Sequence, residues 1–153
     1  MHDGIKLRLQ LNGYPVLFDG AGKRVNIRSR KSIALLALLA TSELGERSRA
    51  WLQQKLWGGR EPSQAQASLR RELSNLRKVL ATPRDWLESD HMSVRINLEL
   101  VDVDIHRPDR GAHGEFLEGI DIPGADDFED WLREMRNRFK PGESGADPLS
   151  APG

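Results

Sequence analysis

The chain has 153 residues and no cysteine, and its 23 basic and 23 acidic side chains give a formal net charge of zero. This length suits one domain with a real core and an appendage, and the lack of cysteine excludes disulfide frameworks, thiol nucleophiles and thiolate metal sites. Residues 1–10 lack the apolar core of a secretory signal, and no apolar run approaches membrane-spanning length, so we expect a soluble, cytoplasmic protein without a membrane partner.

Three short strands are expected near the N-terminus. IKLRLQL at residues 5–11 alternates between apolar and polar side chains and is followed by Asn12-Gly13, a strong signal for a two-residue hairpin turn. Residues 14–18 would form the returning strand, residues 19–22 a second turn, and residues 23–27 a third strand. The pattern predicts a small antiparallel sheet.

Two capped helices follow the predicted sheet. Ser29 is a candidate N-cap for a helix from Arg30 to about Ser42, which is apolar nearly all round and should be the central buried helix. Ser48 would cap a second helix that ends at Gly58-Gly59. A tight turn then leads to a basic helical pattern at residues 63–80. Two helices joined in this way are typical of a helix-turn-helix.

The pattern at residues 63–80 predicts one helix with two contrasting faces. At about 100° per residue, its apolar stripe is Ala65, Leu69, Leu73, Leu76 and Leu80, the opposite face is Gln64, Arg71, Ser74, Asn75 and Lys78, and one flank is Arg70 and Arg77. Such a helix can pack on a core and also present donors to a polyanion.

The zero net charge is a cancellation between two parts of the chain. Residues 23–80 hold thirteen basic against four acidic side chains, and residues 81–153 hold eight against seventeen. This asymmetry favours a polyanion-facing surface followed by a segment with a different task. Arg28, Arg30 and Lys31 crowd a helix start, where the helix dipole disfavours cations. Phosphate contact is one explanation for them, and ordinary solvated charge is the other.

Beyond residue 85 the apolar period changes from that of a helix to that of a strand. Residues 86–89 and 93–98 predict a hairpin with Asp90, His91 and Met92 in its turn, and Val101 to Asp104 alternate again. Residues 108–114 are expected to be a linker, and the Gly/Pro/Ser-rich residues 141–153 a disordered tail.

A last amphipathic helix is predicted from about Asp126 to Phe139, with an apolar stripe that includes Phe128 and Trp131. Its stripe would either pack on the rest of the chain or on sequence beyond it, or serve self-association or contact with transcription machinery.

Enzymatic motifs are not visible. His2, His91, His106 and His113 fall in turns or loops without metal-ligand spacing. Asp102 and Asp104 could pair as carboxylates on one strand face, but solvent-facing strand positions or a capping role are the commoner explanations. We therefore expect no cofactor, no metal and no enzyme activity.

The order of these elements resembles the SARP (antibiotic regulatory protein) family of bacterial transcription regulators. The matching stretches are RSRKSIALLALLA at 28–40, SRAWLQQKLWG at 48–58, QAQASLRRELSNLRKVL at 64–80, VDVD at 101–104, and GEFLEGIDIPGADDFEDWLREMRNRF at 114–139. The last of these is similar to the opening of the helical activation domain of that family. The family usually places another helical stretch before this segment and continues for several more helices after it. The chain is expected to be either the front of a longer protein or a shortened regulator.

The resemblance implies an α+β fold: a winged helix-turn-helix of the OmpR type with an N-terminal antiparallel sheet, a three-helix core and a C-terminal β-hairpin wing, followed by a short amphipathic helix. It implies a DNA-binding domain at residues 1–105, an activation-domain-like segment at 106–140 and a tail or linker at 141–153. The implied function is sequence-specific binding of double-stranded DNA by a transcription regulator. RNA polymerase, a homodimer and tandem monomers on direct repeats are the other associations that it suggests.

In this fold the helix at 63–80 would enter the major groove, and the hairpin at 86–98 would reach the minor groove or the backbone. Arg71, Ser74, Asn75 and Lys78 point most directly away from the core and are the candidates for base edges and nearby phosphates. The other DNA-binding candidates are Arg28, Arg30, Lys31, Gln64, Arg70, Arg77, His91 and Arg95.

Two alternatives remain open at this stage. Arg70 and Arg77 could pair within the molecule, with Glu72 or Glu88 as partners. The whole scaffold could also be an interaction or dimerisation module that has lost DNA binding, although the basic segment argues against this.

Overall fold

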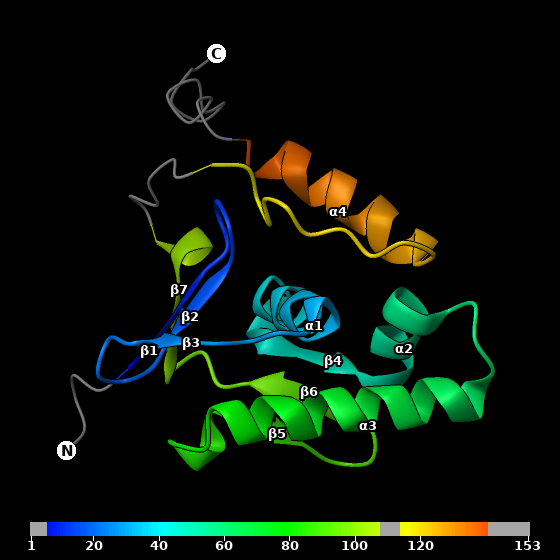
Figure 1. Cartoon of the computed structure of the whole chain (residues 1–153), viewed down its shortest axis with the longest axis horizontal. Helices are drawn as coiled ribbons and strands as arrows, with labels where there is room; N and C mark the ends of the chain where they lie inside the picture. The colour runs from blue at the N-terminus through cyan, green and yellow to red at the C-terminus, as the bar shows by residue number, and fades with distance from the viewer. Residues whose placement is uncertain (1–5, 108–113, 141–153) are drawn as a thin grey trace.

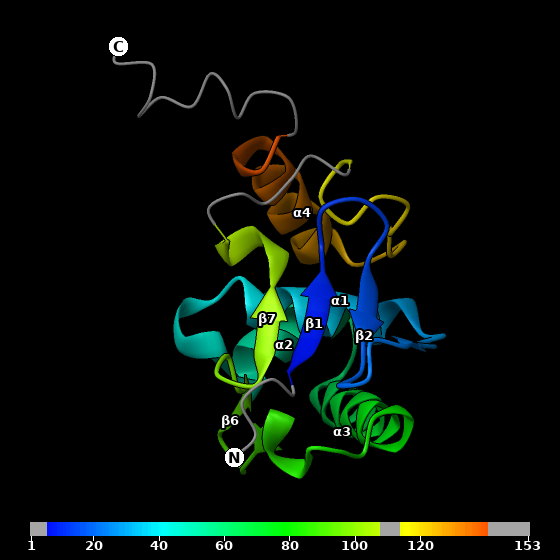
Figure 2. The same cartoon turned by 90° about the vertical axis from the view of Figure 1, so that its left-hand side faces the viewer.

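The computed structural model describes residues 6–107 and 114–140. Within these ranges it has the expected α+β winged-helix fold, with helices and two small sheets. Figures 1 and 2 show α1 and α2 as a middle layer, with α3 on one side of it and α4 on the other. The helices are α1 (Arg30–Ala40), α2 (Arg49–Trp57), α3 (Pro62–Val79) and α4 (Asp126–Arg138).

The first sheet contains strands from both ends of the winged-helix part. Its strands are β1 (Leu7–Gln10), β2 (Val16–Phe18), β3 (Arg24–Val25) and β7 (Val101–Val103), in the order β3-β2-β1-β7. The expected antiparallel pairing holds for β1, β2 and β3, but β7 lies parallel to β1. The sheet is therefore mixed, because the alternating Val101–Val103 segment returns to bury its valines beside the leucines of β1.

The connection between β1 and β2 is longer than the predicted two-residue turn, so that prediction is wrong. Gln10 pairs with Val16, which leaves residues 11–15 in the loop. The backbone N–H groups of Leu11 and Asn12 donate to the buried carboxylate of Asp104, over 2.9 and 3.0 Å. Since these backbone donors are held by a residue more than ninety positions away, they are not available to a tight turn.

The predicted caps of α1 and α2 are confirmed. Ser29 accepts a hydrogen bond from the backbone N–H of Ser32 over 3.2 Å, and Ser48 accepts one from that of Trp51 over 3.0 Å. Every residue of α1 from Ser32 to Ala40 is buried, as expected for the central helix. The helix ends two residues before the predicted Ser42, whose hydroxyl donates back to the Leu38 carbonyl over 2.6 Å.

The wing is a three-stranded sheet rather than the predicted hairpin alone. Strands β5 (Leu87–Ser89) and β6 (Ser93–Ile96) form the hairpin, and β4 (Glu46–Ser48) pairs with the other edge of β6. Both wing strands are shorter than predicted. Trp86 lies in a 3₁₀ turn, where its indole N–H donates to the Leu80 carbonyl over 2.9 Å. The polar β4 has no alternating apolar pattern, so only its pairing with β6 makes it a strand.

The segment at residues 114–140 packs on the rest of the chain. Phe128 is fully buried and Trp131 is 8% exposed, so the interpretation of the α4 stripe as a packing surface is confirmed. The guanidinium of Arg136 donates to the carbonyls of Phe116 and Leu117 over 2.9 and 2.8 Å, which ties α4 to the stretch before it. The helix ends at Arg138, one residue before the predicted boundary. The linker predicted at residues 108–114 falls almost wholly, and the tail at 141–153 entirely, outside the described residues.

Candidate nucleic-acid interface

Helix α3 provides the centre of the candidate interface. It begins at Pro62, one position earlier than predicted, because proline is well suited to the first turn of a helix. The apolar stripe is buried as expected, with Ser68 added to it. Since the stripe holds α3 against the core, the opposite polar face is turned to solvent.

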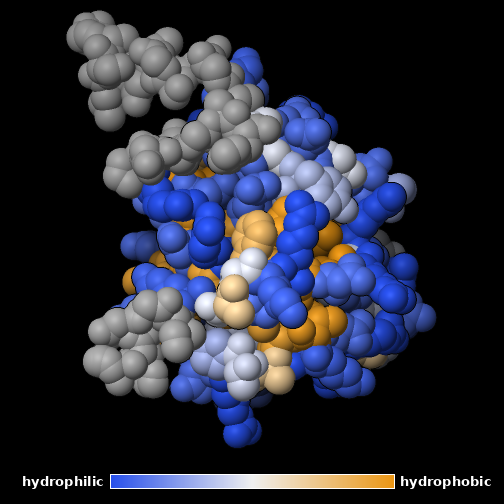
Figure 3. Space-filling model, turned by 60° about the vertical axis from the view of Figure 1, so that its left-hand side comes forward, coloured by the Kyte–Doolittle hydropathy of each residue, from blue (hydrophilic) through white to orange (hydrophobic). Residues whose placement is uncertain are grey.

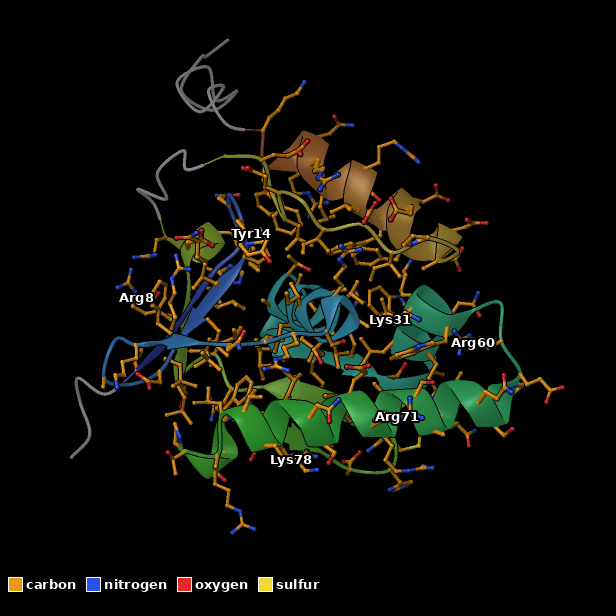
Figure 4. The ribbon with its side chains drawn as sticks, viewed as in Figure 1. Arg8, Tyr14, Lys31, Arg60, Arg71 and Lys78 are labelled. Atoms are coloured by element: carbon orange, nitrogen blue, oxygen red, sulfur yellow. The ribbon has the colours of Figure 1, made fainter. Side chains whose placement is uncertain are left out.

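The four candidates for base contact lie on this outer face. Arg71, Ser74, Asn75 and Lys78 are all exposed, as is Gln64. Within the described residues, none of the five has a side-chain hydrogen bond or ion pair. Figure 4 shows Arg71 and Lys78 extending from the α3 ribbon. These donors are therefore available to a ligand without the loss of an internal contact.

One flank of α3 faces the wing. The Arg77 guanidinium donates to the Ser89 hydroxyl over 2.8 Å, so its internal partner is a serine of β5 rather than Glu72 or Glu88. Both proposed carboxylate partners are wrong, because Glu72 binds serines of α1 and Glu88 pairs with Arg95. Arg77 nevertheless remains exposed, and its charge has no acidic partner among the described ion pairs.

An open groove lies between α3, the start of α2 and the wing tip. Arg70 and His91, both predicted, line it together with Arg49, Gln53 and Gln66. Arg49 also fixes the wing tip, because its side chain donates to the Asp90 carbonyl over 2.6 Å and its backbone N–H donates to the Met92 carbonyl over 2.8 Å. The groove therefore has cationic and amide side chains and a fixed wall.

Asp90 shapes the turn of the wing. Its carboxylate accepts hydrogen bonds from the backbone N–H groups of Met92 and Ser93, both over 2.8 Å. The Ser93 and Met92 hydrogen bonds are the main causes that lower the pKa of Asp90. The turn thus places His91 at an exposed tip.

Arg95 is less available than its predicted role requires. It lies on β6, forms an ion pair with Glu88 on β5, and stands opposite Glu46 in the pairing of β4 with β6. A phosphate contact by Arg95 would have to compete with the Glu88 carboxylate. Its contribution to binding stays a prediction, weaker than that of His91.

The other flank of α3 faces the start of α1. Glu72 of α3 accepts hydrogen bonds from the hydroxyls of Ser29 and Ser32, over 3.0 and 2.6 Å. Because both hydrogen bonds to this carboxylate come from hydroxyls, they occupy none of the nearby basic side chains. Arg28 is exposed, and Arg30 makes one exposed ion pair with Asp121 over 3.5 Å.

Lys31 lies in a cationic cluster with Arg60 at the junction of α1, α2 and α3. Its ammonium is 5.3 Å from the centre of the Trp57 ring. Burial lowers the pKa of Lys31 and the charge of Arg60 lowers it further, whereas Glu72 raises it. Figure 4 shows Lys31 and Arg60 above Arg71 on the same side of the molecule. The repulsion between Lys31 and Arg60 outweighs the attraction of Glu72, and a bound anion would relieve it.

Four residues of this surface were not among the predicted contacts: Arg49, Gln53, Arg60 and Gln66. Arg49 follows the Ser48 cap, and Arg60 stands in the turn before α3. A helix-turn-helix brings the start of its first helix and its turn close to the second helix, so their positions in the motif were a usable signal. Gln66 lies on the wing-side flank beside Arg70, and the helical spacing could have indicated it.

Other kinds of site have little support in the structure. No group of three or more His, Asp or Glu side chains in the described residues could hold a metal ion. Asp104 caps backbone donors, and Asp102 faces Arg107 over 3.7 Å, so the two carboxylates have structural partners. Among the described residues, no helix has both the length and the apolar character to cross a membrane.

The sequence matches no family model and no curated protein. Among solved structures, EmbR of Mycobacterium tuberculosis, in complex with a low-affinity phosphopeptide, is similar with a TM-score of 0.62 and 22% sequence identity. The similarity covers 87% of this chain, and the chain spans 41% of the EmbR chain. At this level of identity the similarity supports the winged-helix fold and the placement of the appended segment, and nothing beyond the fold.

Proposed function

We propose that this chain is a bacterial transcription regulator that binds double-stranded DNA at specific sequences. Helix α3 would enter the major groove and read bases with Arg71, Ser74, Asn75 and Lys78. An arginine can bind guanine through two hydrogen bonds and an asparagine can bind adenine in the same way, each pair giving roughly 1–3 kcal/mol of discrimination.

The single observation that carries this proposal is the outer face of α3. Its arginine, lysine, serine and asparagine are exposed and lack internal partners in the described residues, on a helix whose other face is fixed in a winged-helix core. Buried or internally paired donors would argue for a structural helix. The free donors favour an external polyanion with hydrogen-bonding groups.

Two cationic flanks would hold the sugar–phosphate backbones on either side of the groove. On the wing side these are Arg49, Arg70, Arg77 and His91, and on the α1 side they are Arg28, Arg30, Lys31 and Arg60. Such contacts fix the register of the protein on the duplex without reading sequence. The tip of the wing would reach the adjacent minor groove or backbone.

The decisive experiment is gel retardation with a DNA selected from a random pool at physiological salt. The double variant Arg71→Ala with Lys78→Ala should lose retardation and keep its melting temperature, because both side chains are exposed and have no partner within residues 6–107 and 114–140. The matched control is Arg133→Ala with Arg138→Ala on α4, which removes the same net charge from the opposite side of the molecule (Figure 1). The control should bind DNA like the parent chain.

The outcomes separate the rival functions. Retained binding by the Arg71/Lys78 variant would reject α3 as the recognition helix. If the selection recovers no DNA, and binding to any duplex is weak and insensitive to salt, the protein-interaction module becomes the better explanation. A selected direct repeat would indicate tandem monomers, and a palindrome would indicate a two-fold dimer. Contact with RNA polymerase is part of the proposed regulatory role and needs its own binding assay.

A further inference from the structure

A hollow of about 280 Å³, lined mostly by apolar residues, lies between β3 and α1. Its floor is formed by leucines of β1, β2 and α1 that are less than 4% exposed. Val25, Ile27 and Ile33 line its side, and the exposed Tyr14 stands at its rim. Figure 3 shows apolar side chains in the middle of the sheet side of the molecule, framed by hydrophilic ones.

The strand beside this hollow has an open edge. β3 is the outermost strand of its sheet, with β2 on one side only. The Asp19 N–H donates to the Lys23 carbonyl over 2.8 Å, so Asp19 and Lys23 form a hydrogen-bonded pair. Hydrogen-bonded and non-hydrogen-bonded residue pairs alternate along antiparallel strands. Val25 therefore forms backbone hydrogen bonds with Leu17, whereas Arg24 forms none with its partner Phe18.

The backbone N–H and C=O groups of Arg24 therefore point away from β2, toward the open side of β3. The same alternation directs those of Asn26 to this side. Within the described residues, no backbone hydrogen bond uses the N–H of Asn26. Both residues line the hollow. The edge thus presents donors and acceptors two residues apart beside an apolar hollow, which is the arrangement that binds an extended peptide as an added strand.

The charge around this edge is basic. Residues 20–28 contain three Lys or Arg and no Asp or Glu. The nearest acid in sequence, Asp19, uses its carboxylate to accept the N–H groups of Ala21 and Lys23, both over 2.9 Å. Lys23, Arg24 and Arg28 are exposed and have no ion pair among the described residues. Acidic side chains on an added strand would face these cations.

We propose that the β3 edge binds an extended, acidic peptide segment of a partner protein, which adds a strand to the sheet and places an apolar side chain in the hollow. The strand pairing itself uses Arg24 and Asn26, which are not DNA-binding candidates, whereas Arg28 is shared with the α1-side flank of the proposed DNA interface. A second copy of this chain is a poorer occupant. Pairing of β3 with β3 would bring the exposed cations of both copies together, and like charges across strands destabilise the pairing.

The test uses the full ¹⁵N-labelled chain and a short, blocked peptide that alternates glutamate and valine. We expect saturable shifts of the Arg24 and Asn26 amide resonances and slower hydrogen exchange at both. Three control peptides separate the contributions: serine in place of valine, lysine in place of glutamate, and N-methylation of alternate backbone nitrogens. Each control should bind at least several-fold more weakly, because each removes apolar burial, charge or main-chain pairing.

Arg24→Glu should weaken binding of the glutamate–valine peptide roughly tenfold, since an attractive charge becomes a repulsive one. Arg84→Glu makes the same change on an exposed arginine near the far end of α3 and should leave binding unchanged. Melting curves of both variants check folding. The proposal would be overturned if the serine or N-methylated peptide bound as tightly as the glutamate–valine peptide, or if the latter did not bind. It would also be overturned if the edge resonances shifted on dilution, which would show that β3 pairs with another copy of the chain.

Discussion

Ser32 of α1 donates its hydroxyl hydrogen to the carboxylate of Glu72 on α3 over 2.6 Å, and Ser29 donates to the same oxygen over 3.0 Å. The first turn of the central helix is thereby fastened to the middle of the proposed recognition helix. Ser32 is 1% exposed, so water has little access to its side of this bond. The pair sets the position of α3 relative to the core and removes an unpaired carboxylate from the proposed DNA-binding side.

Ser32→Ala should therefore lower the free energy of unfolding by about 1–3 kcal/mol, because a charged acceptor loses a buried donor. Denaturant unfolding measures this change. The exposed Ser74→Ala is a matched control, because this serine of α3 has no partner in the part of the chain that the structure describes, and its stability should stay within about 0.5 kcal/mol of the parent chain. An unchanged Ser32→Ala protein would show that the contact does not stabilise the fold.

Lys31→Met should separate binding from stability. The substitution keeps an apolar stem against Trp57 and removes a charge that Arg60 repels, so stability should change by no more than about 1 kcal/mol. DNA affinity should fall, and the salt slope of binding should drop by about one. An unaltered salt slope would exclude a phosphate contact by Lys31.

The pH dependence of the Lys31 contribution follows from the direction of its pKa shift. The folded-state pKa lies below the ordinary value of about 10.4, so the unfolded chain binds more protons between the two. The parent chain should gain stability as the pH rises through that window. This gain in stability should be absent from the Lys31→Met variant. Identical curves of the free energy of unfolding against pH for the two proteins would contradict a lowered pKa of Lys31.

Arg77→Ala and Ser89→Ala together test the role of the wing-side flank. Both variants remove the hydrogen bond between α3 and β5, so both should lose a similar part of the free energy of unfolding. Only Arg77→Ala also removes a charge, and it alone should weaken binding to all DNA sequences by a similar factor and lower the salt slope by about one. Equal DNA affinities of the two variants would assign Arg77 a purely structural role.

The turn of the wing should open in acid. The folded-state pKa of Asp90 lies below the ordinary carboxyl value of about 3.9, because two backbone N–H groups bind its charged form. Its stabilising contribution is present above the ordinary value and is lost as the pH falls through the lowered one. The Met92 and Ser93 amide resonances should shift together on acid titration, and Asp90→Asn should abolish the shift. A normal titration point for Asp90 would reject the turn geometry.

Phe128→Ala should destabilise the whole chain, since the ring is fully buried and its centre lies 5.4 Å from that of the Trp131 ring. A loss of about 3–5 kcal/mol is expected for such a truncation. Light scattering should still give the mass of the parent chain, because the α4 stripe is covered within the molecule. If the parent chain is a dimer and the Phe128→Ala variant is a monomer, α4 instead lies in a dimer interface.

Local signals predicted the helices well, because the information lies within a few residues. Ser29 and Ser48 cap the helices that they were expected to cap, and the 3.6-residue period of α3 separated its buried leucines from its exposed polar residues. The exposed outer face of α3 follows from that period. The residues of the candidate interface that lie on one helix were accordingly predictable.

Pairings between distant segments were not predictable in the same way. Asn12-Gly13 has a hairpin sequence, but Asp104 binds the backbone donors of Leu11 and Asn12. The polar β4 becomes a strand only because β6 lies beside it. The partners of Arg77 and Arg95 likewise depend on which side chains the wing brings near α3.

Four properties follow from the amino-acid sequence alone: the helices, their caps, the buried and exposed faces of α3, and the charge difference between the two parts of the chain. These properties depend on helical periodicity and on composition, which are local. Which cations of the described residues lack an acidic partner depends on the packing of distant segments, because pairing requires short distances between elements. Folding binds Glu72 to serines and Glu88 to Arg95, brings Arg49 to the groove beside α3 and Lys31 near Arg60, and leaves β3 at the sheet edge next to the hollow.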